Sequence, residues 1–493
     1  MRAARRRGPW MQDVEVEDDT PVADPGVGLP ATLRAAVRWG GRHAVGAAVL
    51  AVVLLTVGSV TVLGVPRWSL AAERRALTLP VSAPGLVQPQ PEAPGSRWSA
   101  RVPWDARVVL AGETVVAWSA RADDPVVTGV DLVTGAVRWR TRLPDDGRGT
   151  VRTCLPLVLP GIGAAVACLG VVGGDGLGEQ GLPLPVLTTD VVLDADDGSV
   201  VARRSLVGAV GSVVATGTDV ILVVAHRGRL DAARVDVRSG VERWRVPVLA
   251  RPSPTDVERL VVVLRGGVAL VAGAGSATAL DAGSGRRVVA DLAATGRLDT
   301  AGLLIDGSVV ASAYGAPSRA LSLTSTVYGP DGSVRLTLPG AVREPALSDG
   351  AAGQLYCWSE PTGGPFVGRV SAVDRRTGQV RWRSQAAAAD VLVDVGGVAV
   401  FLGGGYVVGV DARTGVELWR RVVSINTSTD VLTDGSRLLV VRLEPWRGAV
   451  VRALDLRDGT TVWEVDLPTG VTRVEQLGTH LVGVGPGLVV LLR

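Results

Sequence analysis

The stretch that decides the fold is Val410-Asp411-Ala412-Arg413-Thr414-Gly415-Val416-Glu417-Leu418-Trp419, a phrase that returns along most of the chain. Four further copies lie at residues 130–139, 235–244, 373–382 and 454–463. All five copies keep an aspartate, a glycine four residues later and a tryptophan four residues after that. These residues are Asp131, Gly135 and Trp139; Asp236, Gly240 and Trp244; Asp374, Gly378 and Trp382; Asp411, Gly415 and Trp419; and Asp455, Gly459 and Trp463.

Three weaker copies fill the gaps between these five. Two of them, at residues 193–202 and 280–289, keep the aspartate and glycine without the tryptophan, and the copy at residues 327–336 keeps only Gly332. Successive copies are 37 to 63 residues apart. A period of about 40–50 residues made of short strands is typical of the blades of a β-propeller.

Each copy predicts two strands joined by a tight turn. The apolar residue and aspartate end one strand, and the Thr-Gly or Asp-Gly pair supplies a turn that needs a positive φ. The residues up to the tryptophan then alternate between apolar and polar, which indicates a second strand. Apolar runs upstream, such as residues 221–224, 261–264 and 398–402, add two more strands. The sequence therefore predicts an all-β propeller of four-stranded antiparallel blades over residues 97–493.

The number of blades depends on how the ends of the chain meet. Eight copies are visible, and residues 471–492 add three short apolar strands without a closing phrase. The missing fourth strand is predicted at Arg97–Val102, which would close the ring by joining both ends of the chain in one blade. We expect about eight blades, with one visible copy too degenerate to form its own blade. Seven and nine are the alternatives.

A membrane segment precedes the repeats. Residues 44–65 contain no charged side chain, and about 20 apolar residues suffice to cross a bilayer as a helix. We therefore expect a disordered cytoplasmic tail over residues 1–42, a transmembrane helix over 43–66 and a proline-rich linker over 67–96. The near flanks carry equal numbers of arginines, and the arginines at 2, 5, 6 and 7 favour a cytoplasmic N-terminus. A signal peptide cleaved after residues 69–71 is the alternative.

The repeated phrase resembles the tryptophan-docking motif of quinoprotein-type β-propellers, Ala-x-Asp-x-x-Thr-Gly-x-x-x-Trp. The small leading residue is present at residues 129, 279, 372, 409 and 453, whereas Arg234 stands in that place in one copy. The resemblance implies that each tryptophan packs on the turn glycine of a neighbouring copy and holds two blades together. It also implies an extracytoplasmic setting. The family includes dehydrogenases that use pyrroloquinoline quinone and a non-enzymatic lipoprotein of outer-membrane protein assembly.

The sequence offers little for catalysis. All 51 basic residues are arginine, which excludes the lysine of a P-loop, a kinase or a Schiff-base enzyme. The quinone pocket implied by the family needs adjacent cysteines and a calcium held by acidic and asparagine side chains, yet no two cysteines adjoin and Asn426 is the sole asparagine. We expect no catalytic residue, cofactor or metal. The net charge of +3 and the absence of a basic stripe with aromatics argue against nucleic acid.

The three cysteines lie in two places. Cys154 and Cys168 stand near the ends of two predicted strands around a Pro-Gly turn, where they could face each other. An oxidising extracytoplasmic setting would allow a disulfide there, and the spacing alone does not require one. Cys357 is expected to be a buried apolar residue.

Three functions remain open from the sequence. The first is a non-catalytic platform at the cell envelope that binds a protein partner or a small ligand, because loops on a rigid scaffold are where binding sites gather. The second is a quinone-dependent dehydrogenase. The third is a sensor ectodomain whose short tail would need a separate signalling partner.

Overall fold

The computed structural model describes residues 86–493 without the segments 120–124, 144–148, 173–186, 208, 227–228, 250–259, 274–275, 290–291, 293–296, 315–322, 346, 351–352, 360–367, 389, 404, 424–430 and 445–447. The chain divides into two units, residues 1–68 and 69–493, and every described residue belongs to the second. The predicted tail and transmembrane helix therefore lie outside the described residues, as does the first part of the predicted linker. No helix long and apolar enough to cross a membrane is found in the described part.

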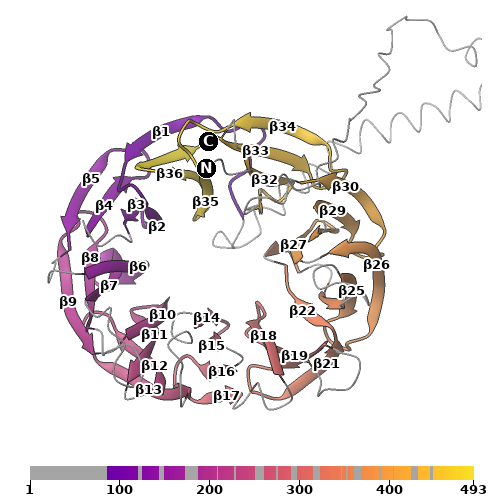
Figure 1. The fold of residues 1–493 in the computed structure, drawn as a ribbon, viewed down its shortest axis with the longest axis horizontal. Coiled ribbons are helices and arrows are strands. Elements are labelled where there is room, and N and C mark those ends of the chain that lie inside the picture. The colour runs from indigo at the N-terminus through magenta and orange to yellow at the C-terminus, as the bar shows by residue number, and fades with distance from the viewer. Residues whose placement is uncertain are drawn as a thin grey trace, which may run out of the picture. The chain divides into compact units, whose positions relative to one another are not determined.

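The described residues form nine sheets, eight with four strands and one with five. Figure 1 shows them following one another around a ring. We number them as blades 1 to 9 in chain order.

Blades 1 to 3 are built from strands of five to eleven residues. Blade 1 comprises β2 (Arg107–Ala111), β3 (Thr114–Trp118), β4 (Val126–Asp131) and β5 (Val137–Arg142). Blade 2 comprises β6 (Gly149–Leu159), β7 (Gly163–Val172), β8 (Leu187–Asp194) and β9 (Val200–Val207). Blade 3 comprises β10 (Ala209–Thr216), β11 (Asp219–His226), β12 (Arg229–Asp236) and β13 (Glu242–Leu249).

Blades 4 and 5 contain two of the three copies that lack the tryptophan, and blade 6 contains a full copy. Blade 4 comprises β14 (Val261–Arg265), β15 (Val268–Gly273), β16 (Ser276–Asp281) and β17 (Arg287–Val289). Blade 5 comprises β18 (Arg297–Leu303), β19 (Val309–Tyr314), β20 (Leu323–Tyr328) and β21 (Val334–Pro339). Blade 6 comprises β22 (Ala341–Arg343), β24 (Gln354–Ser359), β25 (Gly368–Asp374) and β26 (Val380–Ala388).

Blades 7 to 9 complete the ring. Blade 7 comprises β27 (Asp390–Val395), β28 (Val398–Gly403), β29 (Tyr406–Asp411), β30 (Glu417–Val422) and an added strand, β23 (Leu347–Ser348). Blade 8 comprises β31 (Val431–Thr433), β32 (Arg437–Glu444), β33 (Gly448–Asp455) and β34 (Thr461–Asp466). Blade 9 comprises β35 (Arg473–Leu477), β36 (His480–Gly485), β37 (Leu488–Leu492) and β1 (Ser96–Arg101).

Both ends of the chain meet in blade 9. Strand β1 pairs antiparallel with β37, so that Arg101 lies opposite Leu488. Gly95 and Arg493 then exchange two backbone hydrogen bonds of 2.6 and 2.9 Å. The ring is thus closed by the strand that the sequence predicted for this role.

The all-β propeller of four-stranded antiparallel blades is confirmed. The preferred count of eight is one short, and the alternative of nine holds for the described residues. The reason lies in the copy around Gly332, which forms blade 5 even though it lacks the aspartate and tryptophan.

Blade geometry gives the ring two distinct ends. Neighbouring strands are antiparallel, so the turns between first and second strands and between third and fourth strands lie at one end, which we call the turn end. All the repeated phrases turn there. The connections between second and third strands, and between blades, lie at the other end, the connection end. The first strands β2, β10, β14 and β18 lie toward the centre of the ring in Figure 1, the side that we call the channel side.

The hydrophobic core lies between the blades. Buried apolar side chains form nine clusters among the described residues, and each cluster is shared by two successive blades. Val116 of blade 1 and Val166 of blade 2, for example, belong to one cluster. Alternation along the strands puts one set of side chains toward each neighbouring blade. Stability therefore depends on contacts between blades.

Candidate functional site

The aspartate of each repeat holds its own turn. The carboxylate of Asp131 accepts hydrogen bonds from the backbone N–H groups of Val133 (2.9 Å) and Thr134 (2.7 Å) and from the Thr134 hydroxyl (2.8 Å). Its other oxygen accepts from Arg138. These donors, the Thr134 backbone N–H first among them, lower the pKa of Asp131 to about 2. Gly135 completes the turn with φ 73°, which a side chain would disfavour.

The same arrangement recurs in other copies. Asp236 accepts from the backbone of Ser239 at 2.7 Å and pairs with Arg243 at 3.0 Å. Asp374 pairs with Arg381 at 2.6 Å, and this bond is the largest cause of its lowered pKa. The repeated aspartates therefore serve the turns and their neighbouring arginines.

The tryptophans join each blade to the next. The Trp139 indole N–H of blade 1 donates to the carbonyl of Ala195 in blade 2 at 2.9 Å. Its ring lies against Gly198, where a Cβ would come within 2.5 Å of Trp139 Cδ2. The glycine is therefore required both by its φ of 73° and by the ring above it.

Four more tryptophans make the same contact. Each donates its indole N–H to the carbonyl that follows the motif aspartate, or its counterpart, in the next blade. The pairs are Trp98 to Leu132 (2.9 Å), Trp244 to Ala282 (3.1 Å), Trp382 to Ala412 (2.8 Å) and Trp419 to Leu456 (2.8 Å). Trp98 in β1 thus clamps blade 9 onto blade 1.

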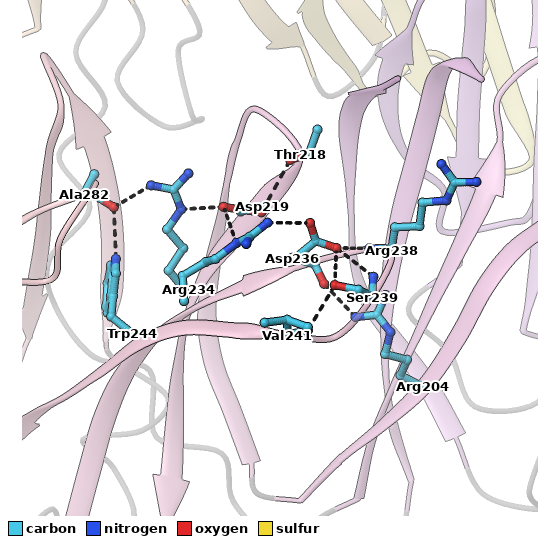
Figure 2. Close-up of polar contacts among 11 residues, drawn as sticks. Arg204, Thr218, Asp219, Arg234, Asp236, Arg238, Ser239, Val241, Trp244 and Ala282 are labelled. Atoms are coloured by element: carbon cyan, nitrogen blue, oxygen red, sulfur yellow. Dashed lines mark hydrogen bonds and ion pairs between the residues drawn. The ribbon is translucent and has the colours of Figure 1, made fainter. Parts of the chain in front are cut away.

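Blade 3 departs from the pattern at Arg234. In blade 1 the small residue Gly129 lies opposite Trp139, and a Cβ there would lie 2.2 Å from the indole ring. In blade 3 the residue opposite Trp244 is Arg234. Figure 2 shows that Arg234 reaches past the ring to the same acceptor as Trp244, the Ala282 carbonyl, at 2.9 Å. It also pairs with the buried carboxylate of Asp219 at 2.6 Å, which balances its charge.

An arginine takes the place of a tryptophan between blades 2 and 3. The Arg204 guanidinium donates to the backbone carbonyl of Asp236 at 2.8 Å (Figure 2). It also donates to the carbonyl of Val237, and its side chain lies against Gly240. Val237 follows the motif aspartate, so its carbonyl is the one that a tryptophan would bind. The sequence analysis missed this residue, which stands two positions beyond the expected tryptophan. The only sequence signal is that a hydrogen-bond donor stands two positions beyond the tryptophan site. Thr141 and Arg421 hold the same position in their blades, and each donates to the carbonyl of the turn glycine in the next blade.

Ion pairs join the three blades where apolar residues stand in for the tryptophan. Gly332 of blade 5 lies against the backbone of Val288, and Gly378 of blade 6 lies against Leu336 and Leu338. At the turn end, Glu344 of blade 6 pairs with Arg265 of blade 4 at 3.7 Å. Further pairs join Arg375 to Glu344 (3.3 Å), Arg375 to Asp306 (3.1 Å) and Arg335 to Asp306 (3.6 Å).

The structure places Cys154 and Cys168 opposite each other in β6 and β7, joined by a disulfide with 4.0 Å between their Cα atoms. Cys357 is buried, and burial raises the pKa of its thiol to about 12. In the described part of the chain, no three His, Cys, Asp or Glu side chains group together as metal ligands.

Two buried carboxylates stand apart from the turns. Asp190 in β8 is 5% exposed, and its Oδ1 has no hydrogen-bond partner among the described residues. Burial raises its pKa to about 6. Asp394 in β27 accepts a hydrogen bond from the Tyr356 hydroxyl of blade 6 at 2.8 Å, and burial raises its pKa to about 6 as well.

Residues 86–95, which we call the entry strap, lie between blades 8 and 9. The Val87 N–H donates to the Thr433 carbonyl at 2.8 Å, and the Gln88 N–H donates to the Thr479 carbonyl at 2.7 Å. The Gln90 N–H binds the buried carboxylate of Asp434 at 2.9 Å. The last part of the predicted linker is therefore packed into the ring.

The entry strap also replaces a missing turn. Blade 9 has no aspartate–glycine turn, because its outer strand β1 comes from the other end of the propeller sequence. Trp463 of blade 8 instead donates its indole N–H to the carbonyl of Gln90 at 3.1 Å. The strap thus supplies the acceptor that a turn supplies between the other tryptophan-clamped blades.

Part of the chain is similar to a known family. Residues 367–492 match the family described as outer membrane protein assembly factor BamB. The assembly factor BamB of Vibrio cholerae serotype O1 is 32% identical over 120 residues, which cover 22% of this chain and 28% of that protein. The chain thus matches less than a third of that relative's length. The predicted quinoprotein-type repeats are confirmed by this match.

Similar solved structures are more distant. BamB from Moraxella catarrhalis is 16% identical, with 82% of this chain and 98% of that chain covered and a TM-score of 0.43. A europium-containing methanol dehydrogenase is 11% identical, with 82% and 87% covered and a TM-score of 0.40. Neither likeness assigns a function.

Proposed function

We propose that this chain is a non-catalytic platform that binds a protein partner at the cell envelope. The observation that carries the proposal is the match of residues 367–492, which lie within blades 6 to 9, to an outer membrane protein assembly factor. The repeated aspartates described above bind turn N–H groups and arginines, which is a structural role and fits a scaffold.

The setting is proposed to be extracytoplasmic, with residues 43–66 as a single-pass anchor and the N-terminus in the cytoplasm. The Cys154–Cys168 disulfide supports this, because disulfides persist in oxidising compartments and are rare in the cytosol.

A quinone-dependent dehydrogenase is the alternative, and the chain's residues do not fit its cofactor. The family's quinone pocket has a disulfide between adjacent cysteines, whereas Cys154 and Cys168 are joined across two strands of blade 2 and Cys357 is buried in blade 6. We accordingly propose that the chain holds no cofactor.

Site-specific photo-crosslinking in cells would test the platform. A photoreactive residue would replace Trp104, 65% exposed at the connection end, or Ile305, 62% exposed at the turn end. Exposed Val200 on the outer strand β9 is the matched control. We expect a discrete adduct with one envelope protein from one end only, reproduced with that protein after purification.

Titration of the purified chain with pyrroloquinoline quinone and calcium, followed by absorbance and melting temperature, is the opposing test. Saturable binding that raises the melting temperature would overturn the platform in favour of the dehydrogenase. Absence of an adduct from either end would also contradict the proposal.

A further inference from the structure

The innermost strand of each blade has one free side. Strands β2, β10 and β14 are first in their sheets and pair with no strand but the second among the described residues. Their other edge faces the channel (Figure 1). On β14 the Val262 N–H donates to the Ser212 hydroxyl of β10 at 3.0 Å, which leaves the part of the edge around Leu264. An unpaired strand edge presents N–H and C=O groups that can pair with another extended segment.

Blade 7 shows such an edge occupied. Strand β23 comes from the segment between β22 and β24 of blade 6 and pairs parallel with β27, with Ser348 opposite Asp394. The Asp349 N–H donates to the Asp394 carbonyl at 3.1 Å. A short segment from outside the blade thus extends its sheet into the channel.

Blade 8 shows the same arrangement with a different segment. Leu86 of the entry strap pairs parallel with Thr433 of β31, and the Val87 N–H donates to the Thr433 carbonyl at 2.8 Å. Thr433 and Asp394 occupy equivalent positions in their blades. In each blade the motif aspartate lies opposite one residue of the second strand, and the next residue of that strand pairs with Thr433 or Asp394. Two unrelated segments therefore dock in the same register on neighbouring blades.

Both segments bury a leucine. Leu86 and Leu347 are each 4% exposed, and both belong to the cluster that blades 7 and 8 share, with Val393 and Leu438. The main-chain pairing thus has the same parallel register at both edges, whereas the leucines stand one position apart. Leu86 lies opposite Thr433 and Leu347 lies opposite Val393, and they enter the same cluster from blade 8 and from blade 7.

Equivalent edges in blades 1, 3 and 4 carry no such segment among the described residues. The residues that correspond to Thr433 are Leu110, Ala215 and Leu264. Strand β14 is the most apolar, with the sequence Val-Val-Val-Leu-Arg, and its sole charge, Arg265, faces Glu344. At Leu264 an uncharged extended segment would meet neither an unpaired charge nor a competing strand, while the Ser212 hydroxyl bound to the Val262 N–H limits how far the segment could pair along β14.

We propose that the inner edges at the turn end of the channel, that of β14 first, bind an extended leucine-bearing segment of a partner protein by parallel strand addition. The proposal rests on the platform function above and names the chemistry of its partner.

A peptide with the sequence of residues 83–90, Ala-Pro-Gly-Leu-Val-Gln-Pro-Gln, is the probe. It would carry fluorescein for polarisation and a benzophenone for crosslinking to the full chain in detergent. We expect saturable binding and crosslinks to β14, β2 or β10. The matched control peptide has aspartate in place of leucine and should bind at least tenfold more weakly, because the leucine would no longer enter the cluster.

The chain variant Leu264→Pro removes a backbone N–H from the channel side of β14 and should abolish crosslinks to that strand. Because the variant could also disturb blade 4, mapping crosslinks on the unaltered chain decides by itself. Crosslinks confined to outer strands or the connection end, or equal binding of the two peptides, would overturn the proposal. The platform would still stand if photo-crosslinking in cells had captured a partner.

Discussion

Replacing Gly198 with alanine tests whether the tryptophan clamps hold the ring together. Gly198 has φ 73°, and an added Cβ would lie 2.5 Å from Trp139 Cδ2. Gly217 is the matched control, because its φ is 61° and nothing lies within 4 Å of an added Cβ. Gly217→Ala should cost about 1–2 kcal/mol, the price of a left-handed conformation.

Gly198→Ala should cost the same backbone term plus the displacement of the Trp139 ring from its place between blades. Complete loss of a buried tryptophan costs about 3–5 kcal/mol, so we expect a total of about 3–6 kcal/mol. Urea unfolding of both variants, with midpoints compared at unchanged slope, measures the difference. Equal losses for Gly198→Ala and Gly217→Ala would refute the clamp as a source of stability.

Four further results are expected. Arg204→Met should lower the free energy of unfolding by about 1–3 kcal/mol, because the Val237 carbonyl loses its guanidinium donor and the Asp236 carbonyl is left with the Gly240 N–H. Arg140→Met on the exposed face of β5 should stay within about 0.5 kcal/mol in the same urea assay. Asp190 has a folded pKa raised to about 6, so its contribution is present below about pH 4 and is lost as the pH rises through about 6. The free energy of unfolding should therefore fall by on the order of 3 kcal/mol between pH 4 and pH 8 because of Asp190. Asp190→Asn should make this fall smaller and leave the part due to Asp394. An equal dependence of stability on pH in the variant would contradict the assignment. Reduction of Cys154–Cys168, which closes a loop of 14 residues, should destabilise the oxidised chain by about 3 kcal/mol and leave Cys154→Ser/Cys168→Ser unaffected by dithiothreitol. A chain that starts at residue 97 should melt below one that starts at 86, because it loses the buried Leu86 and Val87 and the acceptor of Trp463; equal melting temperatures would show that the entry strap adds nothing.

Sequence periodicity was sufficient for the fold because each repeat carries its own turn chemistry. Aspartate, glycine and tryptophan at fixed spacing specify a local turn and one contact with the next blade, so five good copies imply a ring. The closing strand could be found because Trp98 and its flanks match an outer strand. The blade count was less secure, because the copy around Gly332 lacks the motif aspartate and tryptophan, and its Leu336 and Leu338 meet Gly378 of blade 6 where a tryptophan would otherwise lie.

The exceptions could not be predicted, because they depend on contacts between distant residues. Arg234 occupies a position that favours a small side chain, and only the buried Asp219 and the free lone pair of the Ala282 carbonyl make it acceptable. Arg204 works because its guanidinium reaches the Val237 carbonyl, which a tryptophan would have bound, and the Asp236 carbonyl beside it. A sequence pattern shows that the tryptophan is missing and gives no sign of what replaces it.

The entry strap shows why a closed ring of repeats still needs one irregular joint. In a blade shared by both ends, no turn can join the third strand to the fourth, because these two strands come from opposite ends of the propeller sequence. The Trp463 clamp of blade 8 would then lack an acceptor, and the inner edge of β31 would lack a neighbour. Residues 86–90 meet both needs with a few contacts, of which the Gln90 carbonyl and the Val87 N–H are the decisive ones. The segment that leads into the propeller is therefore also part of its closure, so a partner that pulled on it would act directly on the joint between blades 8 and 9.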